Sequence, residues 1–395
     1  MTLKRVIASI MIVVGIGIIS TVAYVNSIRT QQPIFSNNAM LSALWESYKV
    51  EYIEPSSGRT LDKQRNNLTT SEGESYTMLR SVWQDDRTTF DKSLKFTNDI
   101  LKRKDNLFSW QFGKRADGSY GILTDQGGNN TASDADGDIS LALIFASQRW
   151  QSQAYLDQAK QAVSSMWDQE VITVDGKYLL VANNLEKANT DAVIVNPSYF
   201  SPANYRIFAK IDNKHDWNKL ADDSYSWLEN IRTAPSLGNG VGLPPDWVSV
   251  RRDNGQILPP PTSNLTTQFG YDAMRLPFRL SLDVQWNNNQ KAKDALAKLS
   301  FLKDRWAANK KLSAIYSHDG SVVGNYEAPS VYGGTLGYFK YSDTADYDAV
   351  YQAKLKTLYD PDKQAWRNKL SYYDDNWAWF GLALHEDALI DLSKN

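Results

Sequence analysis

The stretch Asn130-Thr-Ala-Ser-Asp-Ala-Asp-Gly-Asp-Ile-Ser-Leu-Ala142 sets three aspartates at alternate positions directly before an apolar run. The aspartates are Asp134, Asp136 and Asp138, and the run covers residues 139–146. A helix that is apolar on all sides belongs inside a protein. Carboxylates at the start of such a helix are unfavourable unless they are paired, hydrogen-bonded or used in chemistry. The stretch therefore predicts an inner helix with a functional acidic site at its N-terminus.

The rest of the chain repeats a contrast between outer and inner helices. Stripes of apolar residues at helical spacing, with polar residues between them, predict outer helices at 90–101, 156–166, 217–231, 292–302 and 347–358. Segments that are apolar almost all round predict inner helices at 139–146, 273–282 and 377–384. Only one hairpin is indicated, with strands 171–173 and 178–181 joined across an Asp-Gly turn. We predict an all-α fold of about a dozen alternating helices, an (α/α)6 barrel of inner and outer helices.

Composition excludes several classes of function. The chain of 395 residues carries 43 basic and 45 acidic side chains without a basic stripe, so nucleic acid is not an expected partner. It has no cysteine, which excludes disulfides, thiolate catalysis and zinc–thiolate sites. Its 3 histidines are isolated in sequence, so we expect no metal site and no cofactor.

The N-terminus is a separate segment. Lys4 and Arg5 precede an uncharged run, residues 6–25, that as a helix spans roughly 30 Å, the thickness of a bilayer core. A cleaved signal has a shorter apolar region, of about 7–15 residues. We therefore expect 1–28 to be an uncleaved signal-anchor or transmembrane helix, 29–37 a linker and 38–395 one folded domain, a monomer at the extracellular face of the membrane. Small residues near Ser20 and Ala23 leave cleavage, and thus secretion, open.

A second acidic stretch, Ser71-Glu72-Gly73-Glu74-Ser75-Tyr76, opens another predicted helix. Hydrolysis of a glycosidic bond needs two carboxyl groups in different environments, one to donate a proton and one to activate water or attack. We take Glu72 as the candidate acid. The structural alternative is that Glu72 complements the helix dipole while Ser71 and Glu74 form a capping box.

The aspartate cluster and a third acidic site have structural alternatives too. Asp138 fits a helix cap, and the alternating aspartates resemble the start of a calcium loop, which then requires Gly where this chain has Ile139. Asp272, in Gly270-Tyr271-Asp272-Ala273-Met274-Arg275, begins a buried helix, and Arg275 lies one turn on, at pairing distance. An ion pair at a helix start explains that spacing without any chemistry.

Aromatic side chains at loop edges are candidates for sugar stacking. The chain has 13 Trp and 21 Tyr, and flat amphipathic rings stack on sugars as well as filling cores. Trp110 and Tyr199 stand at such edges.

Taken together, these motifs resemble glycoside hydrolase family 8. The segment from Ala132 to Trp150 is similar to that family's signature, with Ser140 in place of the usual Ala. Further similar elements follow in family order over roughly residues 38–390: Ser71-Glu72-Gly73 with Tyr76, 107–113, 196–199, Pro245-Asp246-Trp247, 271–275 and Tyr372-Tyr373.

The resemblance implies an (α/α)6 barrel with a sugar-binding cleft and inversion at the anomeric carbon. It implies Glu72 as the proton donor, Asp134 as the aspartate at the central sugar subsite and Asp272 as the general base of one subfamily. It also implies a β-1,4-linked polysaccharide substrate: glucan, xylan, chitosan or a bacterial exopolysaccharide. Substrate contacts are expected from Tyr76, Trp110, Tyr199, Tyr271 and Arg275.

Two readings from other classes remain at this stage. The chain could be a non-catalytic polysaccharide-binding protein at the cell surface, which would keep the aromatic cleft without turnover. It could also be a polysaccharide lyase, because similar helical barrels host that chemistry. Retention of three carboxylates favours the hydrolase.

Overall fold

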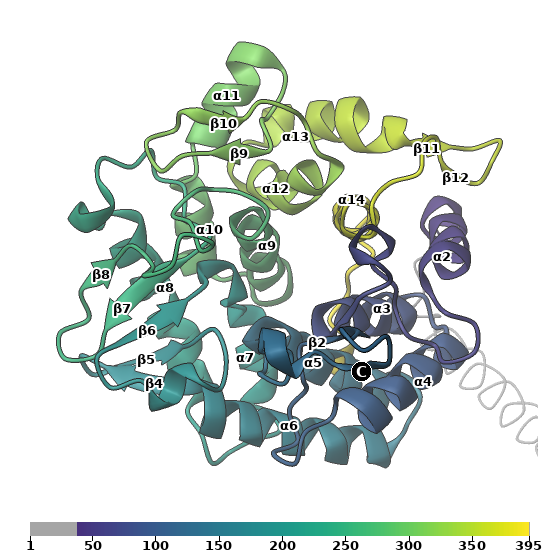
Figure 1. The fold of residues 1–395 in the computed structure, drawn as a ribbon. Helices are drawn as coiled ribbons and strands as arrows, with labels where there is room; N and C mark the ends of the chain where they lie inside the picture. Colours follow the sequence, from purple (N-terminus) through teal and green to yellow (C-terminus); the bar gives the residue numbers. More distant parts are fainter. Residues whose placement is uncertain (1–37, 395) are drawn as a thin grey trace, which may run out of the picture. The chain divides into compact units, whose positions relative to one another are not determined.

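Residues 38–394 are the part of the chain that the structure, a computed structural model, describes, and they form helices in two layers (Figure 1). The predicted anchor (1–28) and linker (29–37) lie outside these residues. Within 38–394, no helix combines the length and the apolar character needed to cross a membrane.

The inner layer is a ring of helices that are buried along nearly their whole length. In the described residues these are α3 (Ser71–Trp83), α5 (Ser133–Arg149), α7 (Pro202–Phe208), α9 (Leu276–Asn287), α12 (Pro329–Ser342) and α14 (Tyr372–His385). In α5, every residue from Ser133 to Ser147 is buried, as the apolar run after Asp138 predicted. The segment 377–384 lies in an inner helix, as predicted, and 273–282 does so from Leu276 on, after a 3₁₀ turn at Ala273–Arg275.

The outer layer consists of helices that bury one face. They are α2 (Ala39–Tyr52), α4 (Arg87–Phe96), α6 (Gln153–Glu170), α8 (Trp217–Arg232), α10 (Gln290–Ala297), α11 (Phe301–Asn309) and α13 (Thr344–Val350). Inner and outer helices alternate along most of the chain, an arrangement consistent with the predicted (α/α)6 barrel.

One predicted outer helix, 292–302, is wrong as a single element. It is two helices, α10 and α11, with a corner between them at which Leu299 is 3% exposed. The apolar stripe continues through the corner because Leu299 is buried there between exposed neighbours, so periodicity did not reveal the break. The stripe at 347–358 likewise runs from α13 into a π-helical turn, Tyr351–Leu355.

Helix α12 escaped prediction because its sequence is rich in glycine, a poor helix former. The glycines allow close packing on both sides. A Cβ at Gly333 would lie 1.8 Å from the carbonyl oxygen of Trp377 in α14, and one at Gly334 would lie 2.3 Å from that of Met274, just before α9. The same glycines that weaken the helical signal therefore let α12 sit between two inner neighbours.

The expectation of a single hairpin was wrong, although that hairpin is present as β4 (Val171–Val174) and β5 (Lys177–Leu180). The described residues also contain two three-stranded and two two-stranded antiparallel sheets: β1 (Thr69–Thr70), β2 (Gln111–Lys114) and β3 (Tyr120–Ile122); β6 (Ala192–Val195), β7 (Val248–Arg251) and β8 (Ile257–Leu258); β9 (Ile315–Tyr316) and β10 (Val322–Gly324); β11 (Tyr359–Asp360) and β12 (Ala365–Trp366). Strands this short leave too little alternation to detect in sequence. They lie in the connections between helices, so the fold is mostly rather than wholly helical.

The last inner helix, α14, contacts the first two helices of the described domain, α2 and α3. The indole N–H of Trp379 in α14 donates to the carbonyl oxygen of Leu41 in α2 at 3.1 Å. The buried Arg80 of α3 donates to the side chains of Asp375 and Asn376, each at 3.0 Å. Helix α14 thereby connects the C-terminal part of the domain to its N-terminal part.

Candidate active site

Three predicted carboxylates meet at one arginine. Nη1 of Arg275 lies 2.8 Å from Oε2 of Glu72 and 3.0 Å from Oδ2 of Asp134. Its Nη2 lies 2.5 Å from Oδ1 of Asp272. The Arg275 side chain is 1% exposed, so the cation itself is buried. One cation therefore faces three groups that can each carry a negative charge.

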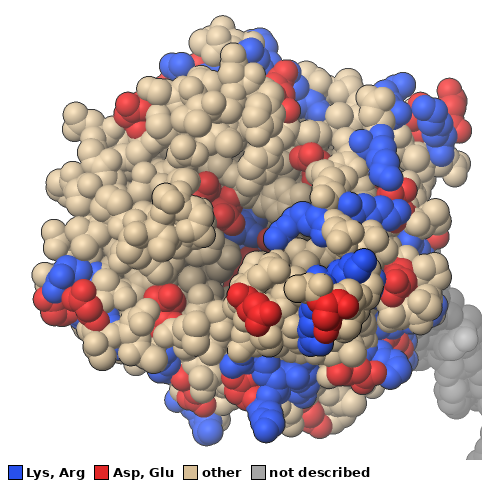
Figure 2. Space-filling view, viewed as in Figure 1, with Lys and Arg blue, Asp and Glu red and all other residues tan. Residues whose placement is uncertain are grey.

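The carboxylates come from the N-terminal ends of inner helices. Glu72 is in the first turn of α3 and Asp134 in the first turn of α5, while Asp272 precedes and Arg275 ends the 3₁₀ turn Ala273–Arg275 that leads into α9. The positive end of a helix dipole favours carboxylates at such positions. Figure 2 shows a hollow on this face of the described domain, with acidic and basic side chains inside it.

Glu72 and Asp272 are the members of this cluster that reach the surface. Their side chains are 23% and 32% exposed, against 2% for Asp134. Glu72 and Asp272 are thus open to solvent and Asp134 is the buried carboxylate of the cluster.

Glu72 is suited to hold a proton near neutral pH. Burial raises its pKa to about 7 against the lowering effect of Arg275, and the nearby Asp134 and Asp272 add to the rise. Its Oε1 also lies 3.4 Å from the hydroxyl of Tyr372, at the start of α14. A carboxylic acid with a pKa near the working pH is what a general acid requires.

Glu74, two residues on, faces a different environment. It is fully buried, and its carboxylate accepts from the backbone N–H of Thr60 at 2.7 Å and from the hydroxyl of Ser93 at 2.5 Å. The predicted capping box of Ser71 and Glu74 is wrong: the helix cap is Thr70, whose hydroxyl accepts from the backbone N–H of Gly73 at 3.0 Å. The pattern misplaced the cap by one residue, and Glu74 turns away from the helix start.

Asp272 is held by two neighbouring residues that the sequence did not assign a role. Oδ1 of Asp246 accepts from the backbone N–H groups of Gly270, Asp272 and Ala273, at 3.1, 3.2 and 2.7 Å. The indole N–H of Trp247 donates to Oδ2 of Asp272 at 2.9 Å. Burial, with the nearby Asp272, raises the pKa of Asp246 to about 7. The sequence indicated these two residues only through the Pro245-Asp246-Trp247 motif, which resembled the family but gave no role to either side chain.

Asp138 is not a helix cap, because it forms a second buried ion pair below the first. Its two oxygens accept from Nη1 and Nη2 of Arg279, both at 2.8 Å. Asp134 and Asp138 are one turn apart on α5, and Arg275 and Arg279 have the same spacing where α9 begins. The two pairs form a ladder between α5 and α9 that fixes the inner helices against each other beside the site.

The predicted aromatic contacts occupy different depths. Tyr199 lies beside the cluster, with the guanidinium of Arg275 5.2 Å from its ring centre and the ring of Trp247 5.7 Å away. Tyr271 is partly exposed, and its carbonyl oxygen accepts from the hydroxyl of Tyr373 at 2.5 Å.

Tyr76 and Trp110 support the site from other sides. Tyr76 is 2% exposed and packs edge-on against Trp377 and Phe380, so it lies beneath the carboxylates. Trp110 is half-buried, and its carbonyl oxygen accepts from the backbone N–H of Ser71 at 3.0 Å, directly before Glu72.

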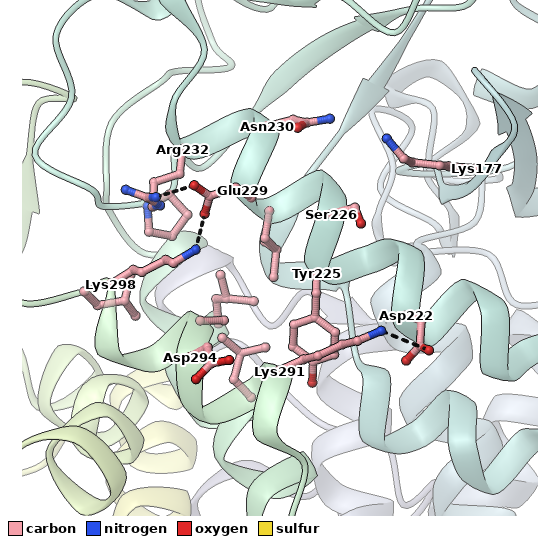
Figure 3. Close-up of a pocket in the computed structure, with 16 residues that line it drawn as sticks. Lys177, Asp222, Tyr225, Ser226, Glu229, Asn230, Arg232, Lys291, Asp294 and Lys298 are labelled. Atoms are coloured by element: carbon pink, nitrogen blue, oxygen red, sulfur yellow. Dashed lines mark hydrogen bonds and ion pairs between the residues drawn. The ribbon is translucent and has the colours of Figure 1, made fainter.

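A separate cavity of about 420 Å³ lies between α8 and α10 (Figure 3). Two of its acidic groups are in ion pairs, Glu229 with Arg232 and Lys298, both at 2.7 Å, and Asp222 with Lys291 at 3.1 Å, while Asp294 accepts from the side-chain amide of Gln290 at 2.8 Å. None of the three carboxylates around Arg275 lines it. Within the described residues, no group of three or more His, Asp or Glu side chains is placed to hold a metal ion.

Comparison with known proteins identifies the family. The family model described as "Glycosyl hydrolases family 8" matches residues 19–373. The chain belongs to glycosyl hydrolase family 8. Membership makes it a glycosidase, an enzyme that cleaves O-glycosyl bonds, and confirms the resemblance predicted from the motifs.

Relatives within family 8 are moderately similar. Endoglucanase A of Acetivibrio thermocellus is 29% identical over 346 residues, which cover 81% of this chain and 68% of that protein. The endo-1,4-D-glucanase of Vibrio fischeri ES114 matches with a TM-score of 0.70 and 25% identity, covering 87% of this chain and 94% of that structure. Endoglucanase Cel10 of Klebsiella pneumoniae matches with a TM-score of 0.69 and 26% identity, covering 88% and 99%. The chain spans 56–68% of the length of the first curated relatives that it matches.

Proposed function

We propose that this family 8 protein is an inverting, endo-acting hydrolase of β-1,4-linked polysaccharide, with Glu72 as general acid and Asp272 as general base. The observation that carries the proposal is the shared arginine, which holds an acid with a pKa of about 7 and a second surface carboxylate on one guanidinium. Two carboxyl groups in different environments at one site are the requirement for glycosidic hydrolysis.

The chemistry follows from these positions. Glu72 donates its proton to the leaving glycosidic oxygen as the bond from the anomeric carbon to that oxygen breaks. Asp272 accepts a proton from a water whose oxygen bonds to the same carbon from the opposite face. Asp134, whose side chain is 2% exposed, holds Arg275 from the buried side, and Arg275 keeps Glu72 and Asp272 in place.

Inversion follows from the roles proposed for Glu72 and Asp272 and is tested on the product. Glu72 and Asp272 contact different nitrogens of Arg275, at 2.8 and 2.5 Å. Inverting enzymes leave about 6.5–9.5 Å between the two carboxyl groups to admit a water, whereas retaining enzymes leave about 5–5.5 Å. Nuclear magnetic resonance of the first sugar released should show an inverted anomeric carbon, and a retained configuration would make Asp272 a nucleophile instead of a base.

The substrate proposal draws on the relatives, several of which are named as endoglucanases. The test is release of reducing ends by the purified chain from carboxymethylcellulose, mixed-linkage β-glucan, chitosan, xylan and bacterial exopolysaccharide, with the Glu72→Gln variant alongside. Cleavage of one polymer by the wild type alone supports the proposal. Binding to a polymer without cleavage over a long incubation would replace it with a non-catalytic binding role.

We further propose that the domain is held at the outer face of the cell membrane. The support is the sequence of residues 1–28, in which Lys4 and Arg5 precede an uncharged run long enough to span a bilayer. Recovery of the full chain in the membrane fraction after a high-salt wash supports this, and recovery of a shortened chain in the medium overturns it.

A further inference from the structure

Asp136 and Glu170 are two buried carboxyl groups that the proposed mechanism leaves unused. Asp136 is the middle aspartate of the acidic stretch and lies two residues after Asp134 on α5. Glu170 is the last residue of α6. Both are 0% exposed. Burying two carboxylates side by side is strongly unfavourable unless a proton or a cation lies between them.

The hydrogen bonds around Asp136 and Glu170 require a proton on one of the two carboxyl groups. Oδ1 of Asp136 accepts from the backbone N–H of Phe108 at 3.0 Å, and Oε1 of Glu170 accepts from the hydroxyl of Thr131 at 2.5 Å. The other oxygen of each carboxyl is buried and receives no N–H or O–H donor from the described residues. The two side chains hydrogen-bond to each other, so the donor between them is a proton on one carboxyl.

No cation compensates this pair. Within residues 38–394 neither carboxyl forms an ion pair, and the charged group of the 102–110 loop that faces them is acidic, because Arg103 is itself bound to Asp105. Asp134 and Tyr205 face Glu170 from α5 and α7. Burial and the facing carboxylates raise the pKa of Asp136 well above its usual range, and burial also raises the pKa of Glu170, so the pair keeps a proton at neutral pH.

The oxygens of Asp136 and Glu170 that accept hydrogen bonds hold two chain segments, and each segment leads to a residue of the active-site cluster. Phe108, bound by Asp136, is two residues before Trp110, whose carbonyl oxygen accepts from the first N–H of α3, that of Ser71. Glu72 is the next residue.

Glu170 holds the segment that leads into α5, as Asp136 holds the segment that leads to α3. Thr131, bound by Glu170, also accepts from the backbone N–H of Asn184 at 2.9 Å and lies three residues before Asp134. Through these contacts the pair reaches the starts of both α3 and α5.

We propose that Asp136 and Glu170 share a proton as a positioning pair, which holds the 107–110 loop and the starts of α3 and α5, and whose deprotonation ends substrate binding at alkaline pH. The proposal rests on the proposed function, since Glu72 and Asp134 are the groups it positions. Below the pH at which the pair ionises, Asp136 donates to Glu170 and its other oxygen holds the N–H of Phe108. Loss of the proton leaves two adjacent buried anions, whose repulsion separates α5 from α6 and frees the loop.

The Asp136→Asn variant separates this role from that of the acid. Its side-chain amide donates permanently to Glu170 while its oxygen accepts from Phe108, which copies the protonated pair at every pH. In the wild type we expect KM to rise at least tenfold between pH 7.5 and 9.5, together with the fall in kcat that ionisation of Glu72 causes. In Asp136→Asn, KM stays within about twofold over that range, and only the fall in kcat remains. Asp136→Ala, which removes the contact, should lower kcat at least tenfold at pH 6.

A readout without substrate keeps the two proposals distinguishable. Hydrogen exchange at the Phe108 amide, corrected for its intrinsic rate, should accelerate at least tenfold above pH 8 in the wild type and not in Asp136→Asn, even if no tested polymer is cleaved. Equal acceleration in both proteins, or the same alkaline rise in KM, overturns the pairing. Full activity of Asp136→Ala overturns the positioning role, and should that variant not fold, the comparison of wild type with Asp136→Asn decides alone.

Discussion

Replacement of Glu72 by Gln should change two quantities that can be measured separately, kcat and the pH dependence of the free energy of unfolding. The folded-state pKa of about 7 lies above the ordinary value of 4.5, so between these pH values the folded protein binds a proton that the unfolded chain has released. The contribution is therefore complete below about pH 4.5 and is lost as the pH rises through 7. At about 1.4 kcal/mol per pKa unit, the loss amounts to about 3 kcal/mol.

The Gln variant has no proton to lose at this position. We expect its free energy of unfolding, relative to the wild type, to improve by about 3 kcal/mol between pH 4.5 and pH 8. Its kcat should be lower by about 10²- to 10⁴-fold at the wild-type optimum, because a general acid contributes that much. Urea unfolding at pH 4.5, 6 and 8 and reducing-end assays on the same preparations measure both quantities.

Glu74→Gln is the matched control, because Glu74 is on the same helix and burial also raises its pKa to about 7. It should show a similar alkaline gain in stability with activity close to wild type, since its carboxylate contacts Thr60 and Ser93 rather than Arg275. If both variants lose activity equally, the loss at position 72 is structural. If Glu72→Gln retains activity, the acid is another residue.

Further variants test the neighbours of Glu72. Asp272→Asn should reduce kcat by about 10²- to 10⁴-fold with little change in binding; full activity would place the base elsewhere. Trp247→Phe removes the N–H that Asp272 accepts, and a charged hydrogen bond of about 1.5–3 kcal/mol predicts a loss in kcat of about ten- to hundredfold, with unchanged kcat counting against its role. Arg275→Met should lower the free energy of unfolding by about 3–5 kcal/mol at pH 7 and by less at pH 4, because the raised pKa of Glu72 leaves that partner protonated there; denaturant unfolding at the two pH values would show any failure of that trend.

The parts of the fold that the sequence predicted are those with long, regular patterns. The apolar run after Asp138 gave an inner helix, and outer stripes such as that from Trp217 to Ile231 gave outer helices. Helix α12 was missed because its glycines serve packing against neighbours that are remote in sequence. The two-residue strands were missed because they carry almost no periodicity.

The site was predicted as a set of residues but not as an arrangement. Local spacing indicated that Asp272 and Arg275 could pair, and the structure confirms that pair. No local pattern indicated that Arg275 would also bind Glu72, which is 203 residues away. The fully buried Glu74 shows the opposite error, because a capping pattern explained it while its true partners, Thr60 and Ser93, lay outside the pattern.

The junction of α14 with α2 and α3 bears on how the protein is made. Contacts between residues far apart in sequence form late, because their loops must close first. The hydroxyl of Tyr372 reaches Glu72 across 300 residues, and Asp375 reaches Arg80 across 295. A ribosome that has delivered everything up to residue 370 has therefore produced most of the helices but not the surroundings of the acid. Newly made chains should remain inactive until α14 emerges from the ribosome. Premature termination before α14 should therefore abolish activity completely and not merely reduce it.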